Sequence, residues 1–109
     1  MALIDLTAII TPKSPEKGLR FLALFEACVS YTEKYERGYV YRYELHKGIP
    51  DKNGKEQFVV LESYKDEDGM QKHMKSPPVL ELVERGAKED LTDVQVILTT
   101  KGAGISSKL

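Results

Sequence analysis

The residue with the clearest chemical potential in this sequence is His73, which lies in a segment with the period of a helix. Met70 and Met74 lie beside it on an apolar face of that segment. An unperturbed imidazole titrates near neutral pH, so this side chain could accept a proton from a bound substrate. The alternative is structural, with the ring hydrogen-bonded to a carboxylate or carbonyl and fixing the helix.

Two residues of the preceding segment could act with this histidine. The period of a strand places Glu62 and Tyr64 on one face together with Phe58 and Val60. We expect Glu62 to pair with His73, and Tyr64 to serve as a lid or a hydrogen-bond donor. Hairpin packing and a satisfied ion pair are the alternative explanations of these two residues.

Composition narrows the other functional classes. The chain has 109 residues, which fits one domain, and its net charge of −1 argues against general nucleic-acid binding. No apolar run approaches the length of a membrane span, and two histidines without metal-binding spacing predict no metal site. The single cysteine, Cys28, excludes an internal disulfide and fits a reducing compartment. It falls in an apolar helical pattern, so we expect a buried side chain rather than a reactive thiol.

The elements that must position these residues follow from periodicity and turn signals. Alternating and β-branched residues predict four strands, over residues 3–11, 39–46, 58–64 and 92–100. Helical spacing predicts three helices, over residues 15–35, 66–75 and 77–86. Ser14 and Asp66 are predicted N-caps, Gly86 a helix end, and residues 48–54 a turn.

Two of the predicted helices carry apolar stripes that should face the core. The stripe of the first helix comprises Phe21, Leu24, Phe25, Cys28, Tyr31 and Tyr35. The stripe of the last helix comprises Val79, Leu80, Leu82 and Val83. With right-handed crossovers, the element order predicts an α+β, ferredoxin-like βαββαβ fold. Its four-stranded antiparallel sheet has helices on one face and the second and fourth strands at its edges.

The predicted strands are apolar on both faces. The third strand, for example, offers Phe58 and Val60 to one side and Val59 and Leu61 to the other. Helices can cover one face only, and a bare apolar face is unusual in a monomer. We therefore expect a homodimer in which two sheets pack around a two-fold axis. The alternative is a monomer with a partly apolar sheet.

The segment from Glu62 to Pro77 resembles the strand-to-helix signature of the antibiotic-biosynthesis-monooxygenase family. The residues that carry the resemblance are Glu62, Tyr64, Asp66, His73, Ser76 and Pro77. The element order resembles the family over nearly the whole chain. The resemblance implies a homodimeric α+β barrel domain over residues 1–101.

The resemblance also implies chemistry without a cofactor. Relatives include oxygenases that oxidise a small hydrophobic substrate with O2, which here would be a phenol, quinol, polyketide or lipid-derived acid. The implied catalytic residues are His73, Tyr64 and Glu62. The implied substrate-binding residues, for which core packing is the alternative, are Phe25, Tyr43, Phe58, Val60, Met70, Met74 and Val83.

The sequence departs from two branches of this family. Haem-degrading relatives carry an iron-ligating histidine where Val83 or Glu84 stands here, so haem degradation is not expected. Some polyketide oxygenases use an asparagine and a tryptophan where Val60 and Tyr64 stand. Two alternatives to an oxygenase are a non-catalytic dimeric module that binds a small molecule or responds to stress, and an isomerase or lactone-processing enzyme.

The chain ends in Ser107-Lys108-Leu109, the pattern that the peroxisomal import receptor binds. We expect residues 102–109 to form a flexible tail that presents this signal. If the terminus is native, the expected location is the peroxisome; otherwise it is the cytoplasm.

Overall fold

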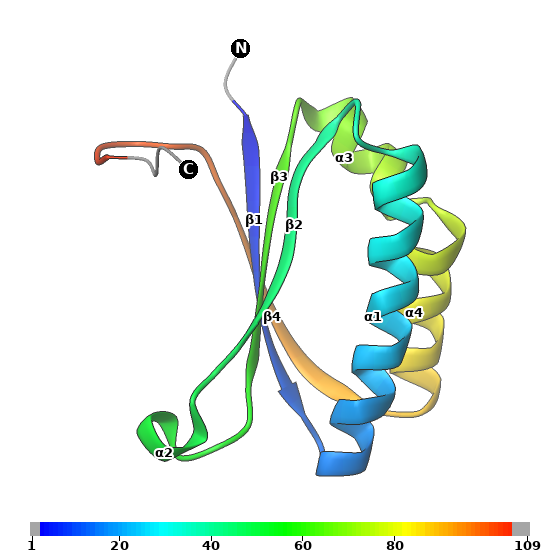
Figure 1. The fold of residues 1–109 in the computed structure, drawn as a ribbon, viewed down its shortest axis with the longest axis vertical. Helices are drawn as coiled ribbons and strands as arrows, with labels where there is room; N and C mark the ends of the chain where they lie inside the picture. The colour runs from blue at the N-terminus through cyan, green and yellow to red at the C-terminus, as the bar shows by residue number, and fades with distance from the viewer. Residues whose placement is uncertain (1–2, 106–109) are drawn as a thin grey trace.

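The computed structural model describes residues 3–105, which form one antiparallel sheet with the three longer helices on one face (Figure 1). The elements are β1 (Ile4–Pro12), α1 (Pro15–Tyr35), β2 (Val40–Lys47), α2 (Pro50–Asn53), β3 (Phe58–Tyr64), α3 (Glu67–Met74), α4 (Pro77–Lys88) and β4 (Thr92–Thr99). The strand order is β2-β3-β1-β4, so the predicted ferredoxin-like fold and its edge strands are confirmed. The predicted import signal lies outside the described residues.

Local signals set the start of the helices. The Ser14 side chain accepts a hydrogen bond from the Lys17 amide at 3.2 Å, and Asp66 accepts one from the Gly69 amide at 2.8 Å. Both caps satisfy amides that have no partner within the helix. Proline stands in the first turn of α1 and of α4, where its missing N–H costs nothing.

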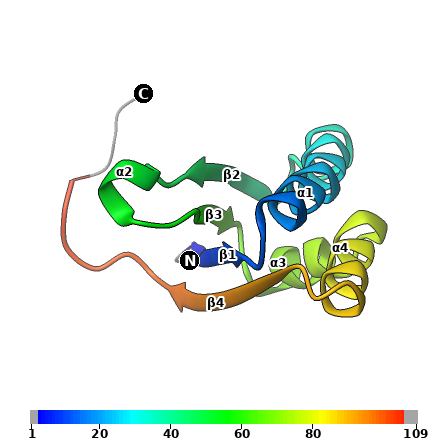
Figure 2. The ribbon, with the colours of Figure 1, turned by 90° about the horizontal axis from the view of Figure 1, so that it is seen from below.

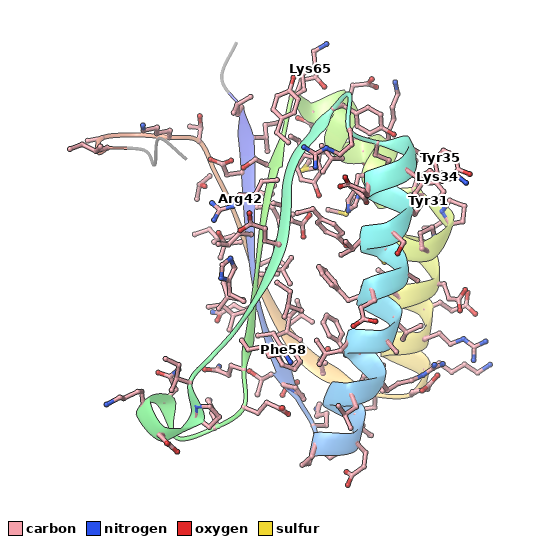
Figure 3. All side chains as sticks on the ribbon, viewed as in Figure 1. Tyr31, Lys34, Tyr35, Arg42, Phe58 and Lys65 are labelled. Atoms are coloured by element: carbon pink, nitrogen blue, oxygen red, sulfur yellow. The ribbon has the colours of Figure 1, made fainter. Side chains whose placement is uncertain are left out.

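The register of the sheet aligns one apolar face beneath the helices. Leu6 on β1 lies opposite Glu62 on β3 and Leu98 on β4. The core between this face and α1 is built from Leu6, Ala8, Ile10, Phe21, Phe25, Val40, Phe58, Val60, Tyr64 and Met70. Figure 3 shows Phe58 pointing from the sheet into this layer.

The second strand does not keep the regular alternation of buried and exposed side chains that its predicted period requires. A bulge between Val40 and Arg42 shifts the phase, so Val40 and Tyr43 face the helices while Tyr41 is exposed. Arg42 points to the opposite face of the sheet (Figure 3).

The buried stripe of α1 also differs from the predicted one at the C-terminal end of the helix. Tyr31 and Tyr35 turn away from the sheet and pack against each other with tilted rings, 4.8 Å between centroids, and Tyr35 is 60% exposed (Figure 3). Thr32 and Glu36 continue the buried face instead. The large aromatic rings suggested burial, but steps of four residues from Cys28 lead to the two polar side chains.

Two turns differ from their predictions. The loop over 48–54 contains the single helical turn α2, closed by Gly54 at φ 78°. The last helix does not end at Gly86 but continues to Lys88. The reversal occurs at Asp90, at φ 51°, while the Leu91 amide donates to the Gly86 carbonyl at 3.0 Å. This geometry closes the helix as a left-handed C-terminal residue does.

The helices cover the sheet incompletely. Of the predicted α4 stripe only Val79 is buried, whereas Leu80 and Val83 are more than half exposed. Val94 and Val96, on the helix side of β4, are also more than half exposed. No helix packs on the other face of the sheet in the described part of the chain, where Leu3, Ile9 and Ile97 are exposed (Figure 2).

Phe58→Ala should test the core beneath α1. The ring is 1% exposed and stacks on Phe21 at 6.0 Å between centroids, so truncation should leave a cavity. We expect the free energy of unfolding in urea to fall by about 3–5 kcal/mol. Leu19→Ala, on the exposed side of α1, should change it by less than about 0.5 kcal/mol. Equal effects of the two substitutions would contradict this packing.

Candidate active site

A pocket of about 440 Å³ lies between the sheet and the helices, where α4 and β4 leave the core partly uncovered. Its walls are largely apolar, with side chains from α1, α3, α4 and all four strands. They include Leu6, Ala8, Ile10, Phe21, Phe25, Val60, Val79, Leu82, Val94 and Val96. This volume falls within the range of pockets that bind small organic ligands.

A buried polar cluster joins this pocket to the end of α1. His73 Nδ1 lies 2.8 Å from Glu36 Oε1, and the two residues are 1% and 2% exposed. Thr32 donates its hydroxyl to Glu36 Oε1 at 3.0 Å, and Tyr39 donates to Glu36 Oε2 at 3.1 Å. Every oxygen of the buried carboxylate therefore has a partner, as such a group requires.

This arrangement fixes the orientation of the imidazole. The Glu36 carboxylate accepts the Nδ1 proton, which leaves Nε2 as the nitrogen free to accept a proton in the neutral ring. His73 is one of the residues that line the pocket. The Tyr43 ring meets the imidazole edge-on at 4.6 Å between centroids, and Tyr64 lies 5.5 Å away. These contacts limit rotation of the ring.

The predicted pairing of Glu62 with His73 is wrong. Glu62 instead accepts a hydrogen bond from the hydroxyl of Tyr64, two residues along the same strand face. Tyr64 is fully buried, so it is a hydrogen-bond donor here and not a lid. Glu36 takes the place expected for Glu62 because the C-cap position of α1 brings its carboxylate within 2.8 Å of the His73 ring.

Burial dominates the electrostatics of the site. Burial raises the pKa of Glu62, while the Tyr64 hydrogen bond and the charge of His73 act in the opposite direction. Burial also raises the pKa of Tyr43 and of Tyr64 far above the ordinary tyrosine value. It raises the pKa of the Cys28 thiol to about 11, so this side chain stays protonated at neutral pH.

The structure separates the predicted substrate-binding residues into two groups. Those that line the pocket are Phe25, Tyr43, Val60, Met74 and Val83. Phe58 and Met70 are packed in the core and do not line it. Among the predicted catalytic residues, His73 and Glu62 line the pocket, and Tyr64 lies behind Glu62.

Sequence reasoning missed Glu36, the residue that holds the imidazole. Cys28, Thr32 and Glu36 recur at four-residue steps, so the helical pattern places them on one face. A carboxylate at the end of a buried stripe is the signal that could have identified it.

A second hollow on the surface does not contain the Glu36–His73 pair. This hollow, of about 540 Å³, lies at the uncovered face, where Asp5, Arg42 and Lys101 line it but His73 does not. Within residues 3–105, no three acidic, histidine or cysteine side chains gather as metal ligands would. No helix in that range is long and apolar enough to cross a bilayer.

Comparison with known proteins identifies the family. A sequence model described as antibiotic biosynthesis monooxygenase matches residues 10–85. A search of curated proteins finds no match. Protein PA3566 from Pseudomonas aeruginosa is similar in structure, with a TM-score of 0.76 and 20% identity over 94% of this chain and 97% of that one. Rv0793 from Mycobacterium tuberculosis has a TM-score of 0.73 and 20% identity, over 99% and 100%.

A further similar structure has a described activity. It is a variant of SnoaB, a cofactor-independent oxygenase from Streptomyces nogalater, with a TM-score of 0.73 and 17% identity. The match covers 98% of this chain and all of that chain. At this identity the likeness shows a shared fold.

Glu62→Gln should show how much burial of the ionised Glu62 carboxylate lowers the free energy of unfolding. Because burial raises its pKa, the native state holds the proton more tightly than the unfolded chain. The free energy of unfolding of the wild type should therefore fall as pH rises from the ordinary glutamate range through the raised native pKa. The variant should lack this fall. In urea, we expect the variant to be more stable at about pH 8, with a difference that shrinks toward about pH 4.

A matched control is Glu33→Gln, which removes an exposed carboxylate that pairs with Arg37 at 3.3 Å. It should change the free energy of unfolding by less than about 0.5 kcal/mol at either pH. If wild type and Glu62→Gln show the same pH dependence, the assigned effect of burial is wrong.

Proposed function

This chain belongs to the antibiotic biosynthesis monooxygenase family, and we propose that it oxidises a small hydrophobic phenol, quinol or enol with O2 without a cofactor. The observation that carries the proposal is an apolar pocket into which His73 presents an imidazole held by a buried carboxylate. The fold shared with a cofactor-independent oxygenase supports it.

The first step would be removal of the hydroxyl proton of the substrate. In the neutral imidazole Nε2 accepts this proton, and Glu36 stabilises the resulting imidazolium through Nδ1. The apolar walls replace part of the water around the new enolate, which makes it a stronger electron donor than it is in water. Tyr43 lies beside the imidazole and lines the pocket, and its hydroxyl interacts with the Cys28 thiol.

The second step would consume O2. The enolate gives one electron to O2, and the resulting radical and superoxide combine to form a carbon–oxygen bond. The peroxide takes a proton, then loses water as its carbon becomes a carbonyl. The carbon that is CH2 in the keto tautomer of the substrate is thereby oxidised to C=O, with one oxygen atom in the product and one in water. All four electrons come from the substrate, so the balance needs no external reductant.

Oxygen uptake with a panel of phenols and quinols tests this proposal. We expect His73→Ala to lower the rate by about 100-fold or more, as loss of a general base does. Glu36→Gln should lower it by about tenfold or more because the imidazole loses its carboxylate partner. The control is His46→Ala, since His46 is exposed and lies 2.9 Å from Glu44. It should retain the wild-type rate.

The proposal fails if no phenol or quinol drives O2 uptake by the wild type. It also fails if His73→Ala retains the full rate. Ligand-induced rise of the melting temperature without O2 uptake would favour a binding module instead.

We also propose that the protein is a homodimer through the uncovered face of its sheet. At the centre of this face Ile9 lies opposite Val59, and Ile97 lies opposite Thr7. Polar residues surround them, with Arg42, Glu44 and His46 along β2, which is the distribution of an interface core and rim. Strands of seven to nine residues present a face of roughly 500 Å² in projection. A standard interface buries about 800 Å² per partner, which is of the same order.

Ile97→Lys tests this interface. Ile97 is 60% exposed on an edge strand, so the monomer should tolerate the change, whereas a paired sheet would bury the charge. Light scattering should give twice the chain mass for the wild type and a mass at least partly shifted to the monomer for Ile97→Lys. Leu19→Lys, on the exposed side of α1, should keep the wild-type mass. A monomeric wild type would overturn the proposal.

A further inference from the structure

We infer that the pocket selects substrates that arrive uncharged, and that Glu62 is the residue that excludes anions. This inference deepens the proposed function, because it concerns the substrate of the same pocket. It rests on the charges that line the cavity and on what proton transfer does to them.

The lining of the pocket carries no fixed positive charge. In the part of the chain that the structure describes, none of its lining residues is lysine or arginine. The acidic residues that line it are Glu62 and Asp90, and Glu36 lies behind His73. A pocket that binds an anionic group normally provides a guanidinium or an ammonium to pair with it.

Histidine cannot supply the missing charge. If the Glu36–His73 pair shares an imidazolium and a carboxylate, its net charge is zero; if the imidazole is neutral, the net charge is negative. Glu62 adds a further negative charge whenever it is ionised. For every state with an ionised Glu36, the net charge of these three groups is zero or negative.

The side chains around Glu62 on the helix side of the sheet add no fixed positive charge to this group. In the sheet, Tyr43 on β2 and Leu6 on β1 flank it, and Tyr64 on β3 donates to it. From the helices, the charges of His73 and Glu36 and the thiol of Cys28 act on this group of side chains. Of these neighbours on the helix side of the sheet, only His73 can become positive. Toward the opposite face, Glu62 also borders the hollow that Arg42 and Lys101 line, which is separate from the pocket.

The cations nearest the rim of the pocket have other partners. Lys13 lies 3.7 Å from Asp90 and 3.2 Å from Asp93, and Lys17 donates to the Asp90 carbonyl at 3.0 Å. Arg42 pairs with Glu44 on the opposite face of the sheet. An anion at the inner end of the pocket would therefore remain without a counter-charge, which is costly in an apolar cavity.

A neutral phenol or enol avoids this cost. It brings its own proton, so transfer to His73 redistributes charge within the pocket without adding any. A carboxylate adds a negative charge beside Glu62 on arrival. Of the substrate classes expected from the sequence, the lipid-derived acid is therefore disfavoured, whereas phenols, quinols and enols are accepted.

The test compares 1-naphthol with 1-naphthoate, which share a ring system but arrive neutral and anionic. Isothermal titration without O2 measures binding and excludes turnover. At about pH 7.5 we expect wild type to bind naphthol at least about tenfold more tightly than naphthoate. In Glu62→Gln this ratio should fall to about threefold or less, mainly because naphthoate binds more tightly. Glu33→Gln, which removes an exposed carboxylate, should keep the wild-type ratio.

A pH series on the wild type gives a second measurement that does not depend on a variant. Naphthoate should bind more tightly as pH falls and Glu62 takes up a proton, because burial raises the pKa of this carboxyl, while naphthol affinity should change little. Equal affinity of the two ligands for wild type, or binding of neither, would overturn the inference. So would a ratio that persists unchanged in folded Glu62→Gln.

These outcomes are distinct from failure of the proposed function. A selective pocket without O2 uptake would leave the inference standing and remove the oxygenase. If phenols drive O2 uptake but naphthoate binds as tightly as naphthol, the oxygenase proposal stands and the inference about Glu62 fails.

Discussion

The buried contact between Glu36 and His73 determines how three parts of the molecule meet. It joins the end of α1 to α3 at 2.8 Å, while Tyr39, just before β2, donates to the same carboxylate. Removing a carboxylate from water is costly, and Thr32, Tyr39 and His73 together offset that cost only in this arrangement. The pair therefore constrains helix, strand and imidazole at once, and a small apolar side chain could fill the space but could not orient the ring.

Incomplete cover of the sheet is the second constraint, and it creates the pocket. If α4 buried its whole predicted stripe, Leu80 and Val83 would fill the space above β4. Instead α4 buries Val79 and packs Leu82 against the core, and Val94 and Val96 of β4 remain more than half exposed. The stability lost by leaving these side chains exposed is offset elsewhere in the core, as is common at functional sites.

Features that depend on local physics were predictable from the sequence. The helix over 15–35 and the strand over 58–64 were predicted with the observed bounds, because a cap, a proline and strict periodicity mark them. The bulge at Tyr41 was not, since it depends on how β2 pairs with β3. The Glu36–His73 pair spans 37 positions in the chain, and polar residues are by default assigned to solvent. Tertiary packing alone brings the pair together.

Glu62 then has a role that its cost to stability helps to explain. An ionised carboxylate in an apolar pocket destabilises an enolate beside it, because two negative charges in a medium of low dielectric repel each other strongly. The same repulsion opposes loss of the substrate's hydroxyl proton, so the Glu36–His73 pair must stabilise the proton that it takes up. Electron transfer to O2 moves the negative charge from the enolate to superoxide within the same pocket, so the net charge near Glu62 does not change in that step. On this view, Glu62 acts on which substrates enter the pocket, and the oxidation itself depends on the His73 imidazole and the apolar walls.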